Sequence, residues 1–405
     1  MEKTKLGINV LQAAQLRISE TFDSFESIYL SFSGGKDSTV MFHLVMEEAI
    51  KRNRKINIMF IDWECQFTIT IDHMREMLAL YADHITPHWI ALPLSTDNSC
   101  SMYQPIWTCW NPDKKELWVR ELPKEAITDY DYFPFYYEGM TFEEFTPLYA
   151  RWMSNGKEIA NFVGIRTQES LNRFRTVARD IVRYKGRSYT ARIDGEADLW
   201  SIYPIYDWQT EDIWTYTGKF NKCYNKLYDL MAKAGLTIHQ MRIDEPFGDT
   251  SRTGLWLYQI IEPQMWAKLV SRVQGANTVN EYGRRSGNVL GNQQISLPEG
   301  HTWKSFAMNI LESMPPATSD HYRNKIAKYI KWYETRGYPE GIEDDAPQEI
   351  FDKVPSWKRV CKVLLKNDYW CSGLGFSITK SSSYDKYMSL MKRRRKEWGL
   401  LNRKK

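Results

Sequence analysis

The chain has 405 residues, which is enough for two domains and a substantial hydrophobic core. Its formal net charge of +4 gives no general indication of nucleic-acid binding, and no apolar run approaches the ~20 residues that cross a bilayer. No signal-peptide core follows Met1 and the 6 cysteines lack CxxC spacing, so we expect a cytoplasmic protein with free thiols and no membrane contact.

The most informative segment lies near the start of the chain. A helix is expected over residues 8–22, followed by an apolar, β-prone run over 28–32, the sequence Ser33-Gly-Gly-Lys-Asp-Ser38, and apolar residues at helical spacing from Val40. Two glycines let the backbone turn tightly, and the start of a helix favours an anion. Leu30 stands where a Walker A loop needs glycine. We therefore expect a different loop that binds phosphate, pyrophosphate or sulfate.

Strand-like and helical segments continue to alternate after this loop. Strands are expected over 56–61, 89–94, 159–165 and the segment that begins at Trp200, and a helix over 71–81. This order predicts an α/β fold with a mostly parallel sheet and helices on both faces. Because the carboxyl ends of parallel strands meet at one edge, the loop, Asp62 and Gly164–Arg166 should lie along one rim.

Four of these segments, in the same order, resemble the phosphoadenosine phosphosulfate (PAPS) reductase family of the PP-loop adenine-nucleotide α-hydrolase superfamily. The loop resembles the PP-loop itself, and Asp62 with the residues that follow resembles the second-strand motif Asp-Thr-Gly-x-x-Phe-x-x-Thr. The other two are similar to the Gly-Ile-Arg-x-x-Glu-Ser-x-x-Arg and Trp-x-x-x-Asp-[Val/Ile]-Trp motifs of the family. The matching segments are Ser33–Ser38, Asp62–Thr70, Gly164–Arg173 and Trp200–Trp214.

The resemblance implies a Rossmann-like PP-loop domain that binds ATP or a PAPS-like adenine nucleotide, with Mg²⁺ if the ligand is ATP. It implies that Lys36 and Arg166 are catalytic, because they would stabilise charge on phosphate oxygens. Asp37 or Asp62 is suited to holding Mg²⁺, and the alternative for Asp37 is that it caps the helix start. The alternative for Glu169 is pairing with a neighbouring arginine. No set of resident metal ligands is assigned. The implied nucleotide contacts are Ser31, Ser33, Gly34, Gly35, Lys36, Asp37, Ser38, Asp62, Gly164, Arg166, Glu169 and Arg173.

The chain also departs from the family pattern. Trp63 and Glu64 replace the Thr-Gly of the second-strand motif, and the nucleophilic cysteine motif Glu-Cys-Gly-[Ile/Leu]-His does not occur. Where iron–sulfur relatives carry cysteines, this chain has His239, Met241 and Arg242, so no iron–sulfur cluster is expected. Cys371 and Cys65 are the remaining candidate nucleophiles, although nothing near them in sequence indicates a lowered pKa.

The chain divides into a nucleotide-binding domain over 1–248, with a tryptophan-rich insert over about 97–156, and a helical domain of unknown function over 249–405. Helices are expected over 254–273, 303–314, 321–333 and 354–365, and an acidic linker over 337–347. This layout resembles a subfamily of uncharacterised bacterial proteins similar to those encoded beside ParB-like partners. Basic stretches over 166–192 and 392–396 are candidate nucleic-acid contacts or ordinary solvated faces.

Three functions are open at this point. The first is an enzyme that uses ATP or a related nucleotide to adenylate, or transfer a sulfur group to, an unidentified acceptor. The second is a nucleotide-sensing regulator that acts with a ParB-like partner or DNA. The third is a true PAPS or APS reductase, which the missing cysteine motif disfavours.

Overall fold

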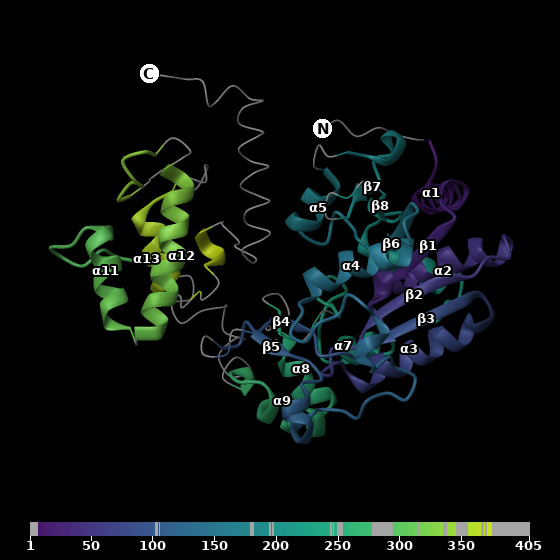
Figure 1. Ribbon diagram of the computed structural model, residues 1–405, viewed down its shortest axis with the longest axis horizontal. Coiled ribbons are helices and arrows are strands. Elements are labelled where there is room, and N and C mark those ends of the chain that lie inside the picture. The colour runs from purple at the N-terminus through teal and green to yellow at the C-terminus, as the bar shows by residue number, and fades with distance from the viewer. Residues whose placement is uncertain are drawn as a thin grey trace. The chain divides into compact units, whose positions relative to one another are not determined.

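The computed structural model describes residues 7–374 of the protein except 102–103, 105, 179–181, 194–195, 197, 244, 246, 249–253, 278–294, 315, 335–337, 346–354, 366–367 and 369–370. It has two compact units, Met1–Glu281 and Tyr282–Lys405 (Figure 1). The domain boundary expected at residue 248 stays a prediction. The first compact unit includes residues beyond it.

The first unit is built on a six-stranded sheet with the order β3-β2-β1-β6-β8-β7. All neighbouring strands pair in parallel except β7, which runs antiparallel to β8 at the edge. The chain proceeds outward from β1 in one direction and later resumes on its other side at β6, so the topological switch point lies between these two strands. The strands are β1 Ser27–Ser31, β2 Ile56–Ile61, β3 Ile85–Ile90, β6 Ile159–Val163, β7 Thr190–Arg192 and β8 Leu199–Ile202.

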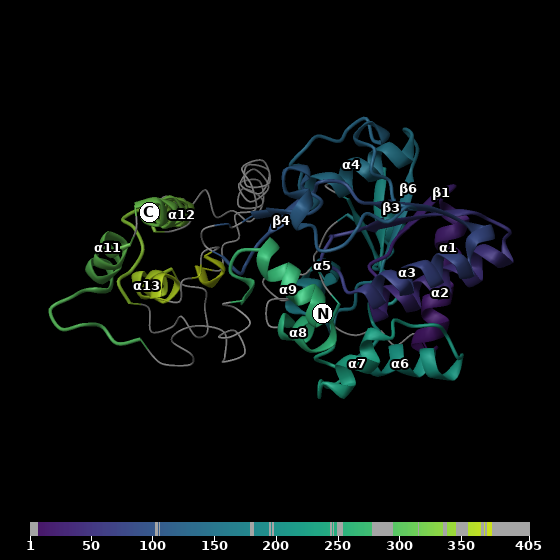
Figure 2. The same cartoon turned by 90° about the horizontal axis from the view of Figure 1, so that it is seen from below.

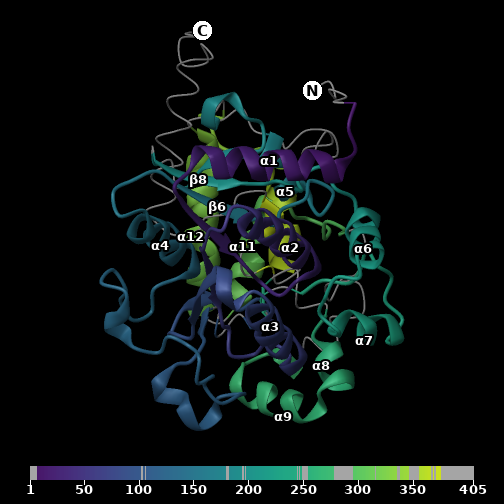
Figure 3. The same ribbon diagram turned by 90° about the vertical axis from the view of Figure 1, so that its right-hand side faces the viewer.

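Both faces of this sheet are buried because alternate residues of each strand point to opposite sides. In β1, Ile28 and Leu30 belong to the core under α1, α2, α3 and α6, whereas Tyr29 belongs to the core under α4 and α7. Figure 2 shows α4 on one side of the strands and α2 and α3 on the other, and Figure 3 shows α1, α2 and α3 in succession along their face. These helices are α1 Val10–Ser24, α2 Lys36–Lys51, α3 Thr68–Leu80, α4 Phe142–Ser154, α6 Thr210–Lys219 and α7 Leu227–Lys233.

The expected α/β class and mostly parallel sheet are confirmed. The strand expected over 159–165 ends at Val163, and two further differences concern β3 and β7. The strand expected over 89–94 is shifted toward the N-terminus. Strand β3 begins at Ile85, four residues before the expected start, and ends at Ile90. Two exposed polar or proline positions near its start hide the apolar pattern there. The antiparallel β7 was not expected, because three residues are too few to show a period.

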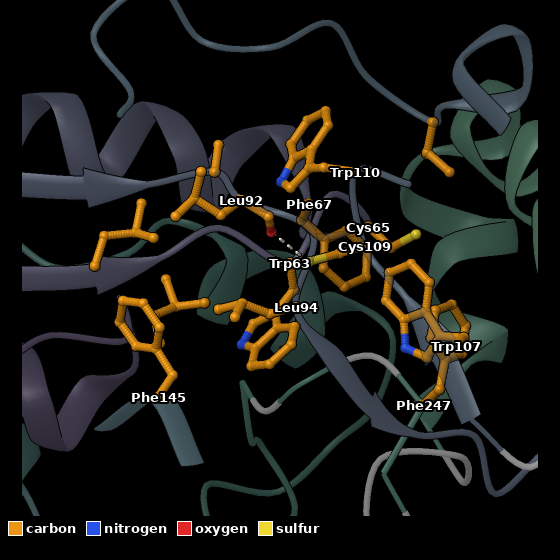
Figure 4. Packing of buried hydrophobic residues seen from close by; sticks show 14 of the residues in the cluster. Trp63, Cys65, Phe67, Leu92, Leu94, Trp107, Cys109, Trp110, Phe145 and Phe247 are labelled. Atoms are coloured by element: carbon orange, nitrogen blue, oxygen red, sulfur yellow. Dashed lines mark hydrogen bonds between the residues drawn. The ribbon is translucent and has the colours of Figure 1, made fainter. Parts of the chain in front are cut away.

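The insert forms a short antiparallel pair and packs into the core. Its elements are β4 Ser95–Asp97, β5 Ile106–Thr108, the 3₁₀ turns η2 Pro112–Leu117 and η3 Tyr130–Tyr132, and α4. Trp107 and Trp110 are each 1% exposed, and Trp107 lies edge-on to Phe247 at 5.0 Å between ring centroids (Figure 4). Beside them, Cys109 Sγ donates to the Leu92 carbonyl at 3.4 Å. These tryptophans therefore pack in the core rather than forming an exposed lid.

Helices α8 Trp256–Ile261 and α9 Pro263–Arg272 complete the first unit. They replace the single helix expected over 254–273, because Pro263 begins a new helix directly after Glu262. Tyr258 stacks on Phe67 with ring centroids 3.8 Å apart and donates from its hydroxyl to the Cys65 carbonyl at 2.7 Å. The start of the C-terminal region thus packs on the turn that follows β2.

The second unit is helical, as expected. Trp303, Tyr322, Tyr329 and Val360 are among the side chains of its own hydrophobic cluster. Its helices are α11 Trp303–Ser313, α12 Pro316–Glu334 and α13 Trp357–Leu365, followed by the 3₁₀ turn η7 Ser372–Leu374. The remaining short elements, in the first unit, are α5 Leu171–Ala178, η1 Ala82–His84 and η4 Tyr184–Gly186. Among the residues that the structure describes, no helix has the length and apolar character to span a membrane.

Candidate functional site

The glycine loop connects β1 to α2 in a conformation that requires its first glycine. Gly34 has φ of +73°, and a Cβ there would meet the Thr70 methyl group at 3.0 Å. Gly35 is the N-cap of α2, and the helix begins at Lys36. Asp37 therefore lies in the first helical turn, and the alternative that it caps the helix is wrong.

Two polar residues from a distant part of the chain hold this loop. Asn225 Nδ2 donates to the Gly34 carbonyl and to Thr70 Oγ1, both at 3.0 Å, and the backbone N–H of Lys36 donates to the Tyr228 hydroxyl at 2.8 Å. Asn225 is fully buried. Sequence reasoning assigned no role to either residue, although a polar Asn beside two tyrosines was a usable signal.

Two cations flank one carboxylate at the start of α2. Lys36 Nζ donates to the Met241 carbonyl at 3.0 Å and lies 3.5 Å from Asp37 Oδ2. On the other side, Arg166 Nε donates to Asp37 Oδ1, and its Nη1 donates to Gln168 Oε1 at 3.2 Å. The Lys36 and Arg166 side chains are only 7% and 2% exposed. The structure thus brings together Lys36, Asp37 and Arg166, three of the predicted site residues.

The loop and the end of β6 approach closely at the switch point. A Cβ on Gly164 would lie 3.0 Å from both the nitrogen and the Cα of Ser38, so glycine allows the two backbones to meet. The Ser38 hydroxyl lies 3.0 Å from the Ser33 hydroxyl, and Ser31 Oγ donates to Asn161 Oδ1 at 3.0 Å. Arg166 lies two residues after Gly164 in the chain, so the close approach at Gly164 places Arg166 beside the loop.

Glu169, just before α5, forms an ion pair with Arg173 in that helix. Glu169 Oε2 lies 3.8 Å from Arg173 Nε, and the Arg173 side chain is 44% exposed. The Glu169 carbonyl accepts from Arg242 Nη2 at 2.6 Å. The pairing of Glu169 with a neighbouring arginine is confirmed, while a direct role of either residue in nucleotide binding stays a prediction.

Asp62 follows β2 as expected, but its carboxylate is fully buried and already bonded. Oδ1 accepts from the Glu64 backbone N–H at 3.0 Å and from Arg120 Nη2, and Oδ2 accepts from Trp89 Nε1 at 3.0 Å. A ligand or Mg²⁺ ion reaches this carboxylate only if one of these donors moves away. Its role in nucleotide binding stays a prediction.

Glu64, at the position where the family motif has glycine, forms a buried ion pair with α9. Arg272 donates from Nε to Oε1 at 2.9 Å and from Nη2 to Oε2 at 3.0 Å, and neither side chain is more than 1% exposed. The backbone N–H groups of Trp110 and Val119 also donate to this carboxylate, at 2.7 and 3.2 Å. One side chain thus links the turn after β2, the insert and α9.

The two candidate nucleophiles and two further cysteines have raised pKa values. Burial raises the pKa of Cys371, the candidate nucleophile, to about 12, and raises that of Cys65 well above its ordinary value. Burial also raises the pKa of Cys361 to about 12, and burial with a Glu76 hydrogen bond raises that of Cys223 to about 12. Since a thiolate is the reactive form, none of these four side chains has the environment of a nucleophilic cysteine.

Several arginines of the first basic stretch are used inside the fold. Arg183 donates to the Val177 and Thr190 carbonyls, and Arg187 donates to the Ser24 hydroxyl at 2.8 Å. Arg192 is exposed and lies over the Trp200 ring. The basic run over 392–396 lies outside the described residues. Contact with nucleic acid or a ParB-like protein stays a prediction.

Comparisons with known proteins identify the family of this chain. Residues 27–233 match the phosphoadenosine phosphosulfate reductase domain family, and residues 235–340 and 338–385 match a domain of unknown function, DUF3440. The chain is 45% identical over 404 residues to the uncharacterized protein YbdN of Escherichia coli K12, covering 98% of each chain.

Solved structures with a similar fold include PAPS reductase from Candida auris in a phosphate complex, with 14% identity, 54% of this chain and 85% of that chain covered, and a TM-score of 0.32. Another is the FMN adenylyltransferase of Candida glabrata with FMN and an ATP analogue, with 16% identity, coverage of 54% and 58%, and a TM-score of 0.34. On the family match and the 45% identical relative, this chain belongs to the phosphoadenosine phosphosulfate reductase domain family and carries a C-terminal DUF3440 domain.

Proposed function

We propose that the protein binds ATP, or a closely related adenine nucleotide, in the Ser33–Ser38 loop and transfers its adenylyl group to an acceptor. The observation that carries this proposal is the arrangement of Lys36 and Arg166 around Asp37 at the start of α2. Two buried cations at a helix start, beside the switch point of a parallel sheet, form a suitable site for a polyphosphate.

The ligand would exchange with a carboxylate that already occupies the anion position. Asp37 offsets one of the two positive charges of Lys36 and Arg166 in the free protein, which lowers the cost of burying them. A phosphate group offers the same cations more oxygen acceptors, and the Arg166 guanidinium can bind two of them at once. Binding therefore requires Asp37 to turn away or to share its partners.

The reaction that follows is an in-line displacement at the α-phosphorus. An oxygen of the acceptor attacks this phosphorus, the bond to the bridging oxygen breaks, and pyrophosphate leaves with the electron pair. The acceptor loses its proton to water or to a base on the acceptor side. Lys36 and the positive end of the α2 dipole stabilise the charge on the departing pyrophosphate.

A magnesium ion would accompany the phosphates rather than sit in a dedicated protein site. Both oxygens of Asp62 accept hydrogen bonds, and Asp37 is paired with two cations, so neither carboxylate is a ready-made ligand. Mg²⁺ commonly keeps several waters and is bound largely through substrate phosphates. It would supply charge neutralisation there.

The same binding site serves the two alternatives, which differ in what happens next. A PAPS reductase needs a thiolate to attack sulfur, and the raised pKa values of Cys65 and Cys371 disfavour this reaction. A nucleotide-sensing regulator would bind ATP without releasing pyrophosphate. Product analysis therefore separates the three functions.

Calorimetric titration with ATP and with PAPS tests the proposed ligand. We expect ATP to bind, Arg166→Lys to weaken binding about tenfold through loss of the two-oxygen contact, and the exposed control Arg192→Lys to bind like the wild type. Incubation with ATP, Mg²⁺ and fractionated small-molecule acceptors should then release pyrophosphate. Absence of ATP binding would refute the proposal, binding without pyrophosphate from any fraction favours the regulator, and thiol-dependent sulfite release from PAPS favours the reductase.

A further inference from the structure

Three side chains that can bind a metal ion meet beside α2. His73 and Glu76 lie on α3, and Cys223 follows α6. Their ligand atoms all lie within 4.8 Å of one another. His73 Nδ1 is 3.8 Å from Cys223 Sγ and 4.0 Å from Glu76 Oε2. The spacing of His73 and Glu76 along one helix brings both onto the same face.

We propose that His73, Glu76 and Cys223 form a zinc site with one position open to solvent. Imidazole nitrogen, carboxylate oxygen and thiolate sulfur are the three donor types that Zn²⁺ takes in proteins. With Zn–N and Zn–O bonds of about 2.0–2.1 Å and a Zn–S bond of about 2.3 Å, tetrahedral ligands lie roughly 3.4–3.6 Å apart. The separations of 3.8 and 4.0 Å therefore need to shrink by roughly 0.2 and 0.6 Å.

The geometry already selects the histidine nitrogen that faces the cluster. His73 Nε2 lies 3.0 Å from the Thr39 hydroxyl, which leaves Nδ1 toward Cys223 and Glu76. Metal-bound histidines commonly have their second nitrogen fixed by such a hydrogen bond, which holds the ring orientation. Thr39 belongs to the first turn of α2, so the proposed metal would be attached to the helix that begins at the loop.

The exposure of the ligands suits a site that binds metal from solution. The His73 side chain is 2% exposed, whereas the Glu76 side chain is 61% exposed and Cys223 is partly exposed. Glu76 can therefore swing onto a metal that arrives from solvent, while the buried imidazole stays fixed. Metal binding displaces the thiol proton of Cys223 into solvent, and the thiolate and Glu76 together offset the charge of Zn²⁺.

The test uses Co²⁺ as a spectroscopic substitute for Zn²⁺ on full-length protein without an affinity tag, after treatment with a chelator. We expect one equivalent of Co²⁺ to bind with a thiolate-to-cobalt absorption band, and Zn²⁺ to abolish the band by displacement. Cys223→Ser should remove the band, and Cys100→Ser, at a partly exposed cysteine outside the cluster, should keep it. Thr39→Val should weaken Co²⁺ binding about 10- to 100-fold without shifting the band.

Glu76→Gln provides a variant that is expected to fold, because its side chain is mostly exposed. It should keep the thiolate band but bind Co²⁺ more weakly than the wild type. The proposal is overturned if the wild type binds no Co²⁺, if the band persists in Cys223→Ser, or if Glu76→Gln and Thr39→Val both bind like the wild type. A site found here would supply resident metal ligands where the sequence analysis assigned none.

Discussion

Replacing Lys36 by methionine removes one positive charge from the loop while keeping most of the hydrocarbon stem. In the free protein, this change deletes the hydrogen bond from Nζ to the Met241 carbonyl and the 3.5 Å contact with Asp37, which keeps Arg166 as its partner. The unliganded variant should therefore lose only about 0.5–1.5 kcal/mol of unfolding free energy. The larger effect is expected in the ligand-bound state.

The expected loss of nucleotide affinity follows from the worth of a hydrogen bond to a charged group, about 1.5–3 kcal/mol. A central value of about 2 kcal/mol corresponds to roughly 30-fold weaker binding. At an ATP concentration about 100 times the wild-type Kd, the ligand stabilises the wild type by about 2.7 kcal/mol. At the same concentration the variant would gain only about 0.9 kcal/mol.

Thermal unfolding with and without ATP measures this difference, each protein being compared with its own unliganded form. Lys51→Met is the matched control, because Lys51 lies in the last turn of the same helix and its side chain is 73% exposed. The control should show the full ATP-induced rise in melting temperature. An equal rise in Lys36→Met and in the control would show that Lys36 does not contact the phosphates.

Three further predictions concern the fold around the site. Glu64→Gln should lower the unfolding free energy in urea by about 3–5 kcal/mol, because it leaves the buried Arg272 without its ion pair; a loss below 1 kcal/mol would contradict this. Gly164→Ala should cost about 1–3 kcal/mol and weaken ATP binding by crowding the start of α2, while Gly218→Ala, with open space around its Cβ position, should be neutral or slightly stabilising. Burial lowers the pKa of His88, so the imidazole binds a proton more readily in the unfolded chain than in the folded protein. The unfolding free energy should therefore fall as the pH drops through about 6.5. His88→Gln should show a shallower fall between pH 7.5 and 5.5 in urea titrations.

The glycine loop between β1 and α2 was predictable from sequence because its signals are local. An apolar strand, two glycines and an amphipathic helix occupy consecutive residues, and the structure places β1, the turn at Gly34 and α2 accordingly. The sequence also allowed the prediction that Lys36 and Arg166 lie near each other, because both follow strands of one parallel sheet. This prediction succeeded because the carboxyl ends of parallel strands lie at one edge of the sheet, which places the residues after them close together.

No such rule predicts the contacts that hold the loop. Lys36 donates to the carbonyl of Met241, and a backbone carbonyl has no residue-specific signal. Tyr228 and Asn225 reach the loop from 192 and 191 residues away along the chain. The pairing of Glu64 with Arg272 spans 208 residues and depends on α9 packing beside the insert, which no local pattern indicated.

The ion pair between Glu64 and Arg272 has a consequence for how this architecture is inherited. Glu64 stands at the glycine of the family's second-strand motif, and Arg272 from the C-terminal region neutralises its buried charge. The acidic residue and the added region should therefore have been acquired together. Gene fusion or exchange that removed α9 would leave an unpaired buried carboxylate, so relatives without this region should have a small uncharged residue at this position.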